Sequence, residues 1–319
     1  MISPEDRFWV VAEAIRGNVH RGYIIDWDQR RWYAVCGPKS LLPPEEEKEV
    51  DDDGILISTD AGDDPTLIPY YPRYSDTPSL HDCSTIRLSE LTELDRLGPG
   101  VDLMSYVDEA VTRKVVFKYS MIVQWMQQIW NELHLVKSFR HPNLVPFDRV
   151  VVDDVESRVL GFTTTYIPGG TLGQKRDRVF RFEWLQQLTA VVDYLNLELG
   201  VVHQDVAPRN LLISPTTDEI QLFDFDRAAP ITRAALPWND VTGVIFTLYE
   251  IMTEDSHLCE VEGPYTPDMP PPSPLLEGCS EAGKPIYNTG VSRRRSDALK
   301  QKKNVIWERP PQQQSNCRR

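Results

Sequence analysis

The sequence lacks the patterns that would mark it as a disulfide-bonded, zinc-binding, secreted or membrane-spanning protein. Its five cysteines in 319 residues are odd in number and scattered, with neither disulfide nor zinc spacing. The start lacks a signal-peptide pattern, and no apolar run approaches the roughly 18 residues of a membrane-spanning helix. We therefore expect an intracellular protein, cytoplasmic or nuclear, without a membrane span.

Positive charge is also scarce. The chain carries 34 Lys and Arg against 48 Asp and Glu, a net charge of −14. Nucleic acid is therefore not an expected partner of the folded body. Residues 291–319 are the exception, with nine basic and two acidic residues, a charge of +7 that leaves −21 for the rest. This segment is either a solvated end or a tail that binds nucleic acid, anionic lipid or an import receptor.

The two ends of the chain look different from its middle. Residues 1–87 read as an extension with a helix over 4–16, a hairpin from 22–27 and 31–36, and an acidic loop over 43–53. Residues 261–319 hold nine of the 25 prolines and only 16 residues of the hydrophobic set in 59. We expect a Pro-rich and then basic tail there, with at most one helix around 296–306.

The middle contains the most informative stretch. Asp205 and Asn210 lie five residues apart in His-Gln-Asp-Val-Ala-Pro-Arg-Asn, and Asp224 follows Asn210 by fourteen residues in Asp-Phe-Asp. Phosphoryl transfer needs this set: a carboxylate that orients a hydroxyl, and an amide with a second carboxylate that hold Mg²⁺. The same letters could form a hairpin whose polar residues cap turns. The agreement of five positions, flanked by apolar pairs, favours the chemical interpretation.

This spacing resembles the catalytic and metal loops of the protein-kinase-like superfamily. The resemblance covers residues 88–253, about half of the chain. It implies an α+β, two-lobed fold with a strand-rich N lobe over 88–165 and a shortened helical C lobe over 166–260. It also implies ATP and Mg²⁺ as cofactors, with Asp205 as the base or orienting group and Asn210 and Asp224 on the metal.

The resemblance further requires a lysine on an upstream strand and a helical glutamate that pairs with it. Lys118 follows an apolar run, and Glu132 lies fourteen residues later in a helical pattern. They are the candidates for the phosphate-positioning pair. The alternatives are a surface lysine and a solvated helix glutamate.

Nucleotide would be bound by Gly98 and Gly100, by Lys118 and Asn210, and by backbone groups near Thr165 and Ile167. The glycine turn lacks the third glycine of the family pattern, and Asp102 is expected to place negative charge near the triphosphate. We therefore expect weak nucleotide affinity. The alternatives are that Gly98 and Gly100 form a common turn, and that the strand near Thr165 simply ends in a Pro-Gly-Gly turn, without nucleotide at either place.

Two helices support this arrangement. Apolar residues at helical spacing over 182–195 match the helix that leads into the catalytic loop, with Gly200 as its stop. The run from Asp240 to Glu250 resembles the buried helix whose leading aspartate holds the catalytic loop, so Asp240 and His203 are assigned structural support. A simple N-cap is the alternative for Asp240.

Three differences from the kinase family pattern limit the regulation and the substrates that we expect. Gln204 stands where the family has arginine, so activation by a phosphorylated loop is not expected. The Asp-x-Ala-x-Arg-Asn pattern is similar to the catalytic loop of tyrosine kinases, but two letters do not establish specificity. Only sixteen residues separate Asp224 from Asp240, without Ala-Pro-Glu, and Asp226 takes the glycine position. The peptide platform of protein kinases is therefore short or absent.

We expect an ATP- and Mg²⁺-dependent phosphotransferase whose hydroxyl acceptor, a small molecule, lipid or protein, the sequence does not name. The alternative is a catalytically weak pseudokinase that binds nucleotide or acts as a scaffold. The degraded glycine turn and the short segment after Asp224 favour that alternative.

Overall fold

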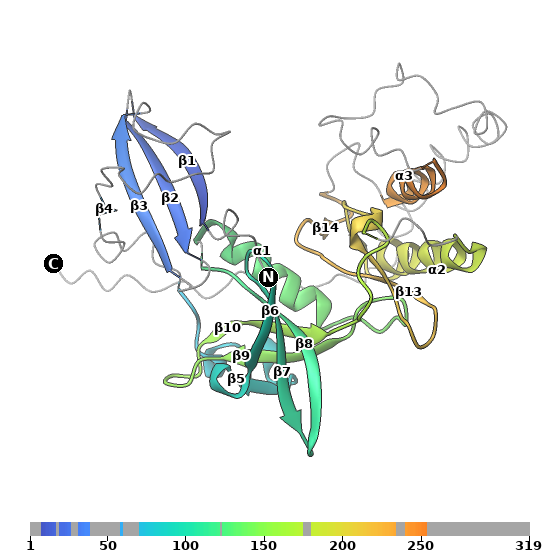
Figure 1. Cartoon of the computed structure of the whole chain (residues 1–319), viewed down its shortest axis with the longest axis horizontal. Coiled ribbons are helices and arrows are strands. Elements are labelled where there is room, and N and C mark those ends of the chain that lie inside the picture. The colour runs from blue at the N-terminus through green and yellow to red at the C-terminus, as the bar shows by residue number, and fades with distance from the viewer. Residues whose placement is uncertain are drawn as a thin grey trace. The chain divides into compact units, whose positions relative to one another are not determined.

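A computed structural model of the chain describes residues 8–16, 19–26, 31–38, 58–59, 70–121, 123–174, 180–233 and 240–253 (Figure 1). The chain divides into two compact units. The described part of the first unit reaches Leu133 and includes Phe147–Tyr166. The second contains His134–Pro146 and the described residues from Ile167 to Thr253.

The N-terminal part forms a four-stranded antiparallel sheet in the order β1-β2-β3-β4. Its strands are β1 (Phe8–Arg16), β2 (Val19–Asp26), β3 (Arg31–Pro38) and β4 (Ser58–Thr59). The expected hairpin is present as β2 and β3, but the expected helix over 4–16 is wrong from residue 8 on. Pairing of β1 along the whole of β2 outweighs the helix propensity of its Ala and Glu residues, and its aromatic and β-branched residues suit a strand.

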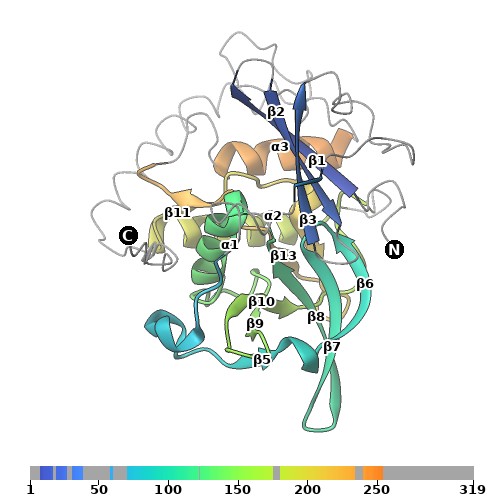
Figure 2. The ribbon, with the colours of Figure 1, turned by 90° about the vertical axis from the view of Figure 1, so that its left-hand side faces the viewer.

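A six-stranded sheet follows, in the order β5-β9-β10-β8-β7-β6, and its strands lie side by side in Figure 2. The strands are β5 (Thr85–Arg87), β6 (Thr92–Gly98), β7 (Val101–Asp108), β8 (Val111–Tyr119), β9 (Phe147–Val152) and β10 (Val159–Thr165). Helix α1 (Val123–Val136) connects β8 to the chain before β9. The strands and the helix expected around Lys118, Glu132 and Thr165 are therefore present.

Side chains of β8 alternate between the two faces of this sheet, as the pleat of a strand requires. Val115, Phe117 and Tyr119 are buried in one hydrophobic core, together with Met104 of β7 and Ile86 of β5. Lys118 therefore points to the other face. Its position on β8 is held by the core residues on either side of it.

The second unit is mainly helical. It contains α2 (Phe182–Asp193), a π-helical turn (Tyr194–Glu198), and α3 (Asp240–Thr253). Between the helices lie the short strands β11 (Val201–Val202), β12 (Leu211–Ile213), β13 (Ile220–Leu222) and β14 (Ala229–Pro230), and the short helix η8 (Pro208–Asn210). Both predicted helices are confirmed, and Gly200 has a φ of 67°, the positive φ of a helix stop.

The prediction of a two-lobed α+β fold is confirmed by this architecture. The acidic loop over 43–53 and the tail over 261–319, with its expected helix at 296–306, lie outside the described residues. The limits proposed for the domains stay predictions. The six-stranded sheet does begin at Thr85, three residues before the start assigned to the N lobe.

Candidate active site

In the first unit, Lys118 and Glu132 form an ion pair. Lys118 Nζ lies 2.7 Å from Glu132 Oε1, and the two side chains are only 14% and 2% exposed. Strand β8 presents the lysine, and helix α1 brings the carboxylate to it. The alternatives of a surface lysine and a solvated glutamate do not describe these two side chains. Their role on phosphate stays a prediction.

Gly98 and Gly100 belong to the turn between β6 and β7, where Gly100 has a φ of 68°. Asp102 does not sit where we expected it. Directly opposite residues of an antiparallel pair share a face, and Lys118 is opposite Val101, whereas Asp102 is opposite Phe117. Asp102 therefore lies on the face away from Lys118.

The charge of Asp102 is balanced inside the protein. Its carboxylate is fully buried and accepts a hydrogen bond of 2.9 Å from Arg96 Nε, across the β6–β7 pair. The structure gives no support to the prediction of negative charge near the triphosphate, because the register of β7 turns this side chain into the core. The weak nucleotide affinity inferred from it loses that support.

The residues predicted to bind adenine lie where β10 ends. Thr165 is the last residue of β10 and pairs with Val115, and the Tyr166 N–H donates to Lys114 O at 3.3 Å. Ile167 begins the second segment of the other unit, after His134–Pro146. The structure therefore assigns the first of these residues to the six-stranded sheet and the second to the other unit, and leaves their binding role as a prediction.

In the second unit, Asp240 holds the loop that contains Asp205. Asp240 is 1% exposed and begins α3. Its carboxylate accepts the backbone N–H of His203 and of Gln204, each at 2.9 Å, and the side-chain amide of Asn196 at 2.8 Å. Three donors on one buried carboxylate make it more than the N-cap that was its alternative.

Helix α3 also packs closely against the same loop. A Cβ added to Gly243 would lie 2.8 Å from Val206 Cβ, so glycine permits this approach. Thr247 Oγ1, one turn further, donates to Val206 O at 3.2 Å. The loop is thus supported by α3 over more than a turn of helix.

His203 links the loop to the segment around Asp224. It is fully buried, and its ring centroid lies 4.5 Å from that of Phe225. The Asp205 N–H donates to Nδ1 at 3.2 Å, which leaves the proton on Nε2 to donate to Phe223 O at 3.0 Å. His203 therefore has the supporting position that was assigned to it.

Asp205 has partners on both carboxylate oxygens. Oδ1 accepts from Arg209 Nη2, and Oδ2 accepts from Asn210 Nδ2 at 2.9 Å. Asn210 Nδ2 also donates to Asp205 O at 2.9 Å. Asp205 is thereby oriented by two neighbours in its own loop.

Asn210 and Asp224 are brought together by the short strands. The Phe223 N–H donates to Asn210 O at 3.2 Å, next to Asp224. Since Asn210 Nδ2 gives its hydrogens to Asp205, the amide oxygen is the atom that a cation would use. An amide oxygen and a carboxylate are ligands that Mg²⁺ prefers, so this pair fits the metal. Among the described residues, no cluster of three or more His, Cys, Asp or Glu forms a metal site.

Two residues near Asp205 take positive φ angles, which are costly for side chains other than glycine. Gln204 and Asp224 both have a φ of 66°. Gln204 uses its side chain to donate to Arg227 O at 2.5 Å, so it ties the loop to the segment after Asp224. Such strained residues are typical of functional loops.

Sequence reasoning missed two residues here. Arg209 was noted only as a letter of the loop pattern, although its spacing of four from Asp205 was a usable signal for an ion pair. Asn196 had no signal at all, because its partner Asp240 is 44 residues away along the chain.

Comparisons with known proteins agree with this geometry. A family profile described as the protein kinase domain matches residues 104–257. CBL-interacting serine/threonine-protein kinase 5 of Arabidopsis thaliana is 31% identical over 129 residues, 38% of this chain and 28% of the relative. CBL-interacting protein kinase 12 of Oryza sativa subsp. japonica is 31% identical over 129 residues, 38% and 23% of the two chains.

A third relative is Aurora kinase B of Danio rerio, 26% identical over 122 residues, which cover 36% of this chain and 37% of the relative. The chain thus spans well under half the length of these relatives. Its fold and loops define a two-lobed, protein-kinase-like domain. The prediction of a protein-kinase-like domain within this chain is confirmed, with the family match at residues 104–257.

Within the described residues, none of the helices has the length and apolar character needed to span a membrane.

Proposed function

We propose that this protein is a phosphotransferase that moves the γ-phosphoryl group of ATP to a hydroxyl acceptor. The observation that carries the proposal is the orientation of Asp205, whose Oδ2 is held by Asn210 in a loop anchored on Asp240. A carboxylate fixed in this way is suited to accept the proton of an attacking hydroxyl. Positioning and charge, rather than covalent chemistry, carry most of phosphoryl transfer.

Four side chains would supply the groups for this chemistry. Lys118, oriented by Glu132, would bind the phosphates of the substrate ATP. Asn210 and Asp224 would hold Mg²⁺, which when bound neutralises charge on the phosphates. Arg209 must share or release Asp205 Oδ1 when a hydroxyl approaches, because that oxygen is already its acceptor.

We propose further that the acceptor is a small hydroxyl compound or a lipid head group. The supporting observation is the path of the chain after Asp224. Within a few residues it returns to its own catalytic loop, where β14 pairs with β11 and the Ile231 N–H donates to Gly200 O at 2.8 Å. Because the segment after Asp224 pairs with β11 within a few residues, it leaves little backbone that an extended peptide could contact. Contacts to the parts of a substrate away from the reacting group are what position it.

Replacing Asp205 with Asn tests the proposal, because it keeps the size of the side chain and removes the base. We expect turnover of labelled ATP, screened against small hydroxyl compounds, lipids and generic proteins, to fall at least about 100-fold. Glu183→Gln removes an exposed carboxylate from the same unit and should leave turnover unchanged. The unmodified protein could instead phosphorylate generic proteins, and Asp205→Asn could abolish that activity. This result would refute the proposal that the acceptor is a small compound or a lipid head group.

The structure adds one observation in favour of the pseudokinase alternative, the hydrogen bond from Arg209 that occupies Asp205 Oδ1. It predicts that Mg-ATP raises the melting temperature while no acceptor is phosphorylated. A ligand at about 100 times its dissociation constant adds about 2.7 kcal/mol of stability. Equal melting temperatures with and without Mg-ATP would exclude both functions.

A further inference from the structure

Residues 70–91, here named the strap, precede the part of the chain that matches the kinase family at 104–257. They are nevertheless bound tightly to the first unit. The strap contains three short 3-10 helices and β5, which pairs in parallel with β9.

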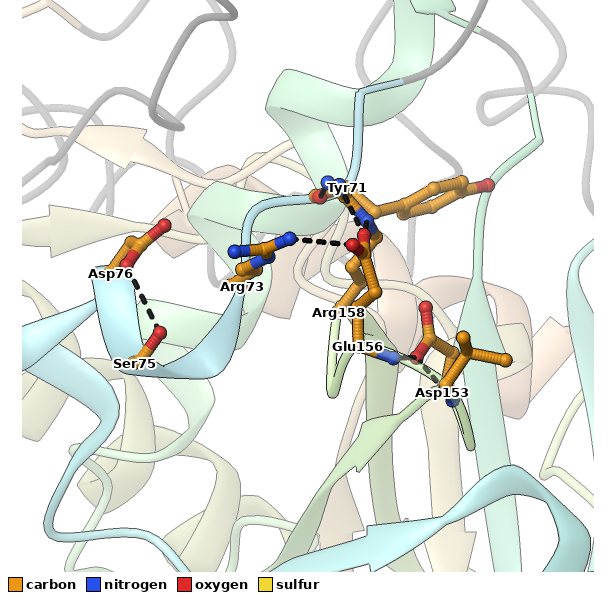
Figure 3. Close-up of polar contacts among 8 residues, drawn as sticks. Tyr71, Arg73, Ser75, Asp76, Asp153, Glu156 and Arg158 are labelled. Carbon is orange, nitrogen blue, oxygen red and sulfur yellow. Dashed lines mark hydrogen bonds and ion pairs between the residues drawn. The ribbon is translucent and has the colours of Figure 1, made fainter.

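One set of contacts fixes the strap to the hairpin between β9 and β10. The Val159 N–H donates to Pro72 O at 2.8 Å, and the Tyr74 N–H donates to Ser157 O at 2.9 Å. The side chains add to this, as Figure 3 shows: Arg73 lies 2.5 Å from Glu156. The start of the strap is thereby attached to β10 by both main chain and side chains.

A second contact fixes the strap to Ser120, which lies between the end of β8 and the start of α1. The Tyr71 hydroxyl donates to Ser120 O at 2.6 Å. Arg158 Nη1 donates to Tyr71 O at 2.8 Å (Figure 3). Burial, helped by nearby Tyr119, raises the pKa of Tyr71 far above its ordinary value, so the group stays a hydroxyl that donates. Ser120 is itself buried.

The position of Ser120 gives this bond its importance. Only three residues, 120–122, join the end of β8 to the start of α1. Three residues reach at most roughly 10 Å, so the position of Ser120 limits where α1 can begin. Glu132 lies on that helix, and Lys118 lies two residues before Ser120.

A third set of contacts lies beneath Lys118. Ile86 and Leu91 of the strap belong to the core that buries Phe117 and Tyr119. The strap therefore supports both partners of the ion pair: the strand of Lys118 through this core, and the helix of Glu132 through Tyr71.

We propose that the strap is a positioning element of the nucleotide site, in which Tyr71 sets α1 so that Glu132 meets Lys118. Its effect on ATP rests on the proposed function. Its effect on α1 does not, and can be measured separately.

Tyr71→Phe in the full chain removes the hydroxyl and leaves Ser120 O without this donor. The loss of a buried hydrogen bond of this kind should raise the equilibrium constant for local opening of the backbone roughly tenfold. We expect amide hydrogen exchange over residues 120–136 to speed up by about tenfold. Tyr74→Phe is the matched control, because its hydroxyl donates to Leu80 O and Cys83 O inside the strap.

The second measurement is the dissociation constant of Mg-ATP, which we expect Tyr71→Phe to raise several-fold and Tyr74→Phe to leave nearly unchanged. In a Lys118→Met background, Tyr71→Phe should add no further loss of binding, because the group that it positions is gone. A merely structural role would weaken binding equally in both backgrounds.

Equal exchange over 120–136 in the two tyrosine variants would overturn the proposal. So would faster exchange with unchanged Mg-ATP binding, since α1 would then be loosened without consequence for the site. If the unmodified protein binds Mg-ATP but transfers no phosphate, the proposed function fails while both measurements still decide on the strap.

Discussion

Breaking the Lys118–Glu132 ion pair from either side should destabilise the first unit by a predictable amount. Lys118→Met and Glu132→Gln each remove one charge and nearly conserve side-chain size. Each single variant leaves its partner in a place that is at most 14% exposed. Removing one partner of a buried ion pair costs about 3–5 kcal/mol, because the remaining charge is not compensated.

The double variant Lys118→Met/Glu132→Gln distinguishes a buried ion pair from an exposed one. With both charges gone, the desolvation cost is gone too, so the double variant should be no less stable than either single variant. The coupling energy should therefore be at least as large as the cost of the more harmful single variant, about 3–5 kcal/mol, above the range of about 0.5–3 kcal/mol that is usual for neighbouring residues. At a separation of 2.7 Å, a gross attraction of about 6 kcal/mol at an effective dielectric constant near 20 leaves room for this net value.

Urea denaturation of the four proteins gives the coupling energy as a double-mutant cycle. Arg113 and Asp108 form the control pair on β7 and β8, at 2.9 Å but with side chains 56% and 29% exposed. Arg113→Met and Asp108→Asn should couple by only about 0.2–1 kcal/mol. Equal coupling in the two pairs would refute the claim that burial makes the Lys118 pair strong.

Two further predictions concern packing and pH. Gly161→Ala would place a Cβ 2.1 Å from Lys118 O and should destabilise the protein by about 1–3 kcal/mol. Gly98→Ala is the control, because its Cβ would have no atom within 4 Å, and it should change stability by less than about 0.5 kcal/mol. Similar melting temperatures of the two variants would contradict the close packing at Gly161. Burial lowers the pKa of His141, against an opposing effect of Glu198, so the unfolded chain binds more protons than the folded one below about pH 6.5. Stability should therefore fall as the pH drops below that value, and His141→Gln should reduce this slope in urea titrations; an unchanged slope would count against the assignment.

Much of the fold and of the site was predictable because the decisive patterns are local. Asp205, Asn210 and Asp224 lie within twenty residues of one another, and short strands bring them together as the spacing indicated. Helical periodicity likewise predicted α2, and the resemblance to the kinase family predicted α3. Such patterns need only the geometry of one loop or one helix.

Other features depended on partners that are remote in sequence. The strand β1 replaced an expected helix because β2 pairs along its whole length. Asp102 turned into the core because the register of β7 places it opposite Phe117. A strand shifted by one residue exchanges its two faces, so composition alone does not say which side chains are buried.

The sequence by itself determined the family and the set of chemical groups, since a short run of residues with fixed spacing carries them. Only the tertiary structure decided how those groups are held: Asp240 beneath the loop, Arg209 on Asp205, and the strap behind Lys118. The physical reason is that hydrogen bonds and packing join atoms across space, and the chain that separates them can have almost any length and composition.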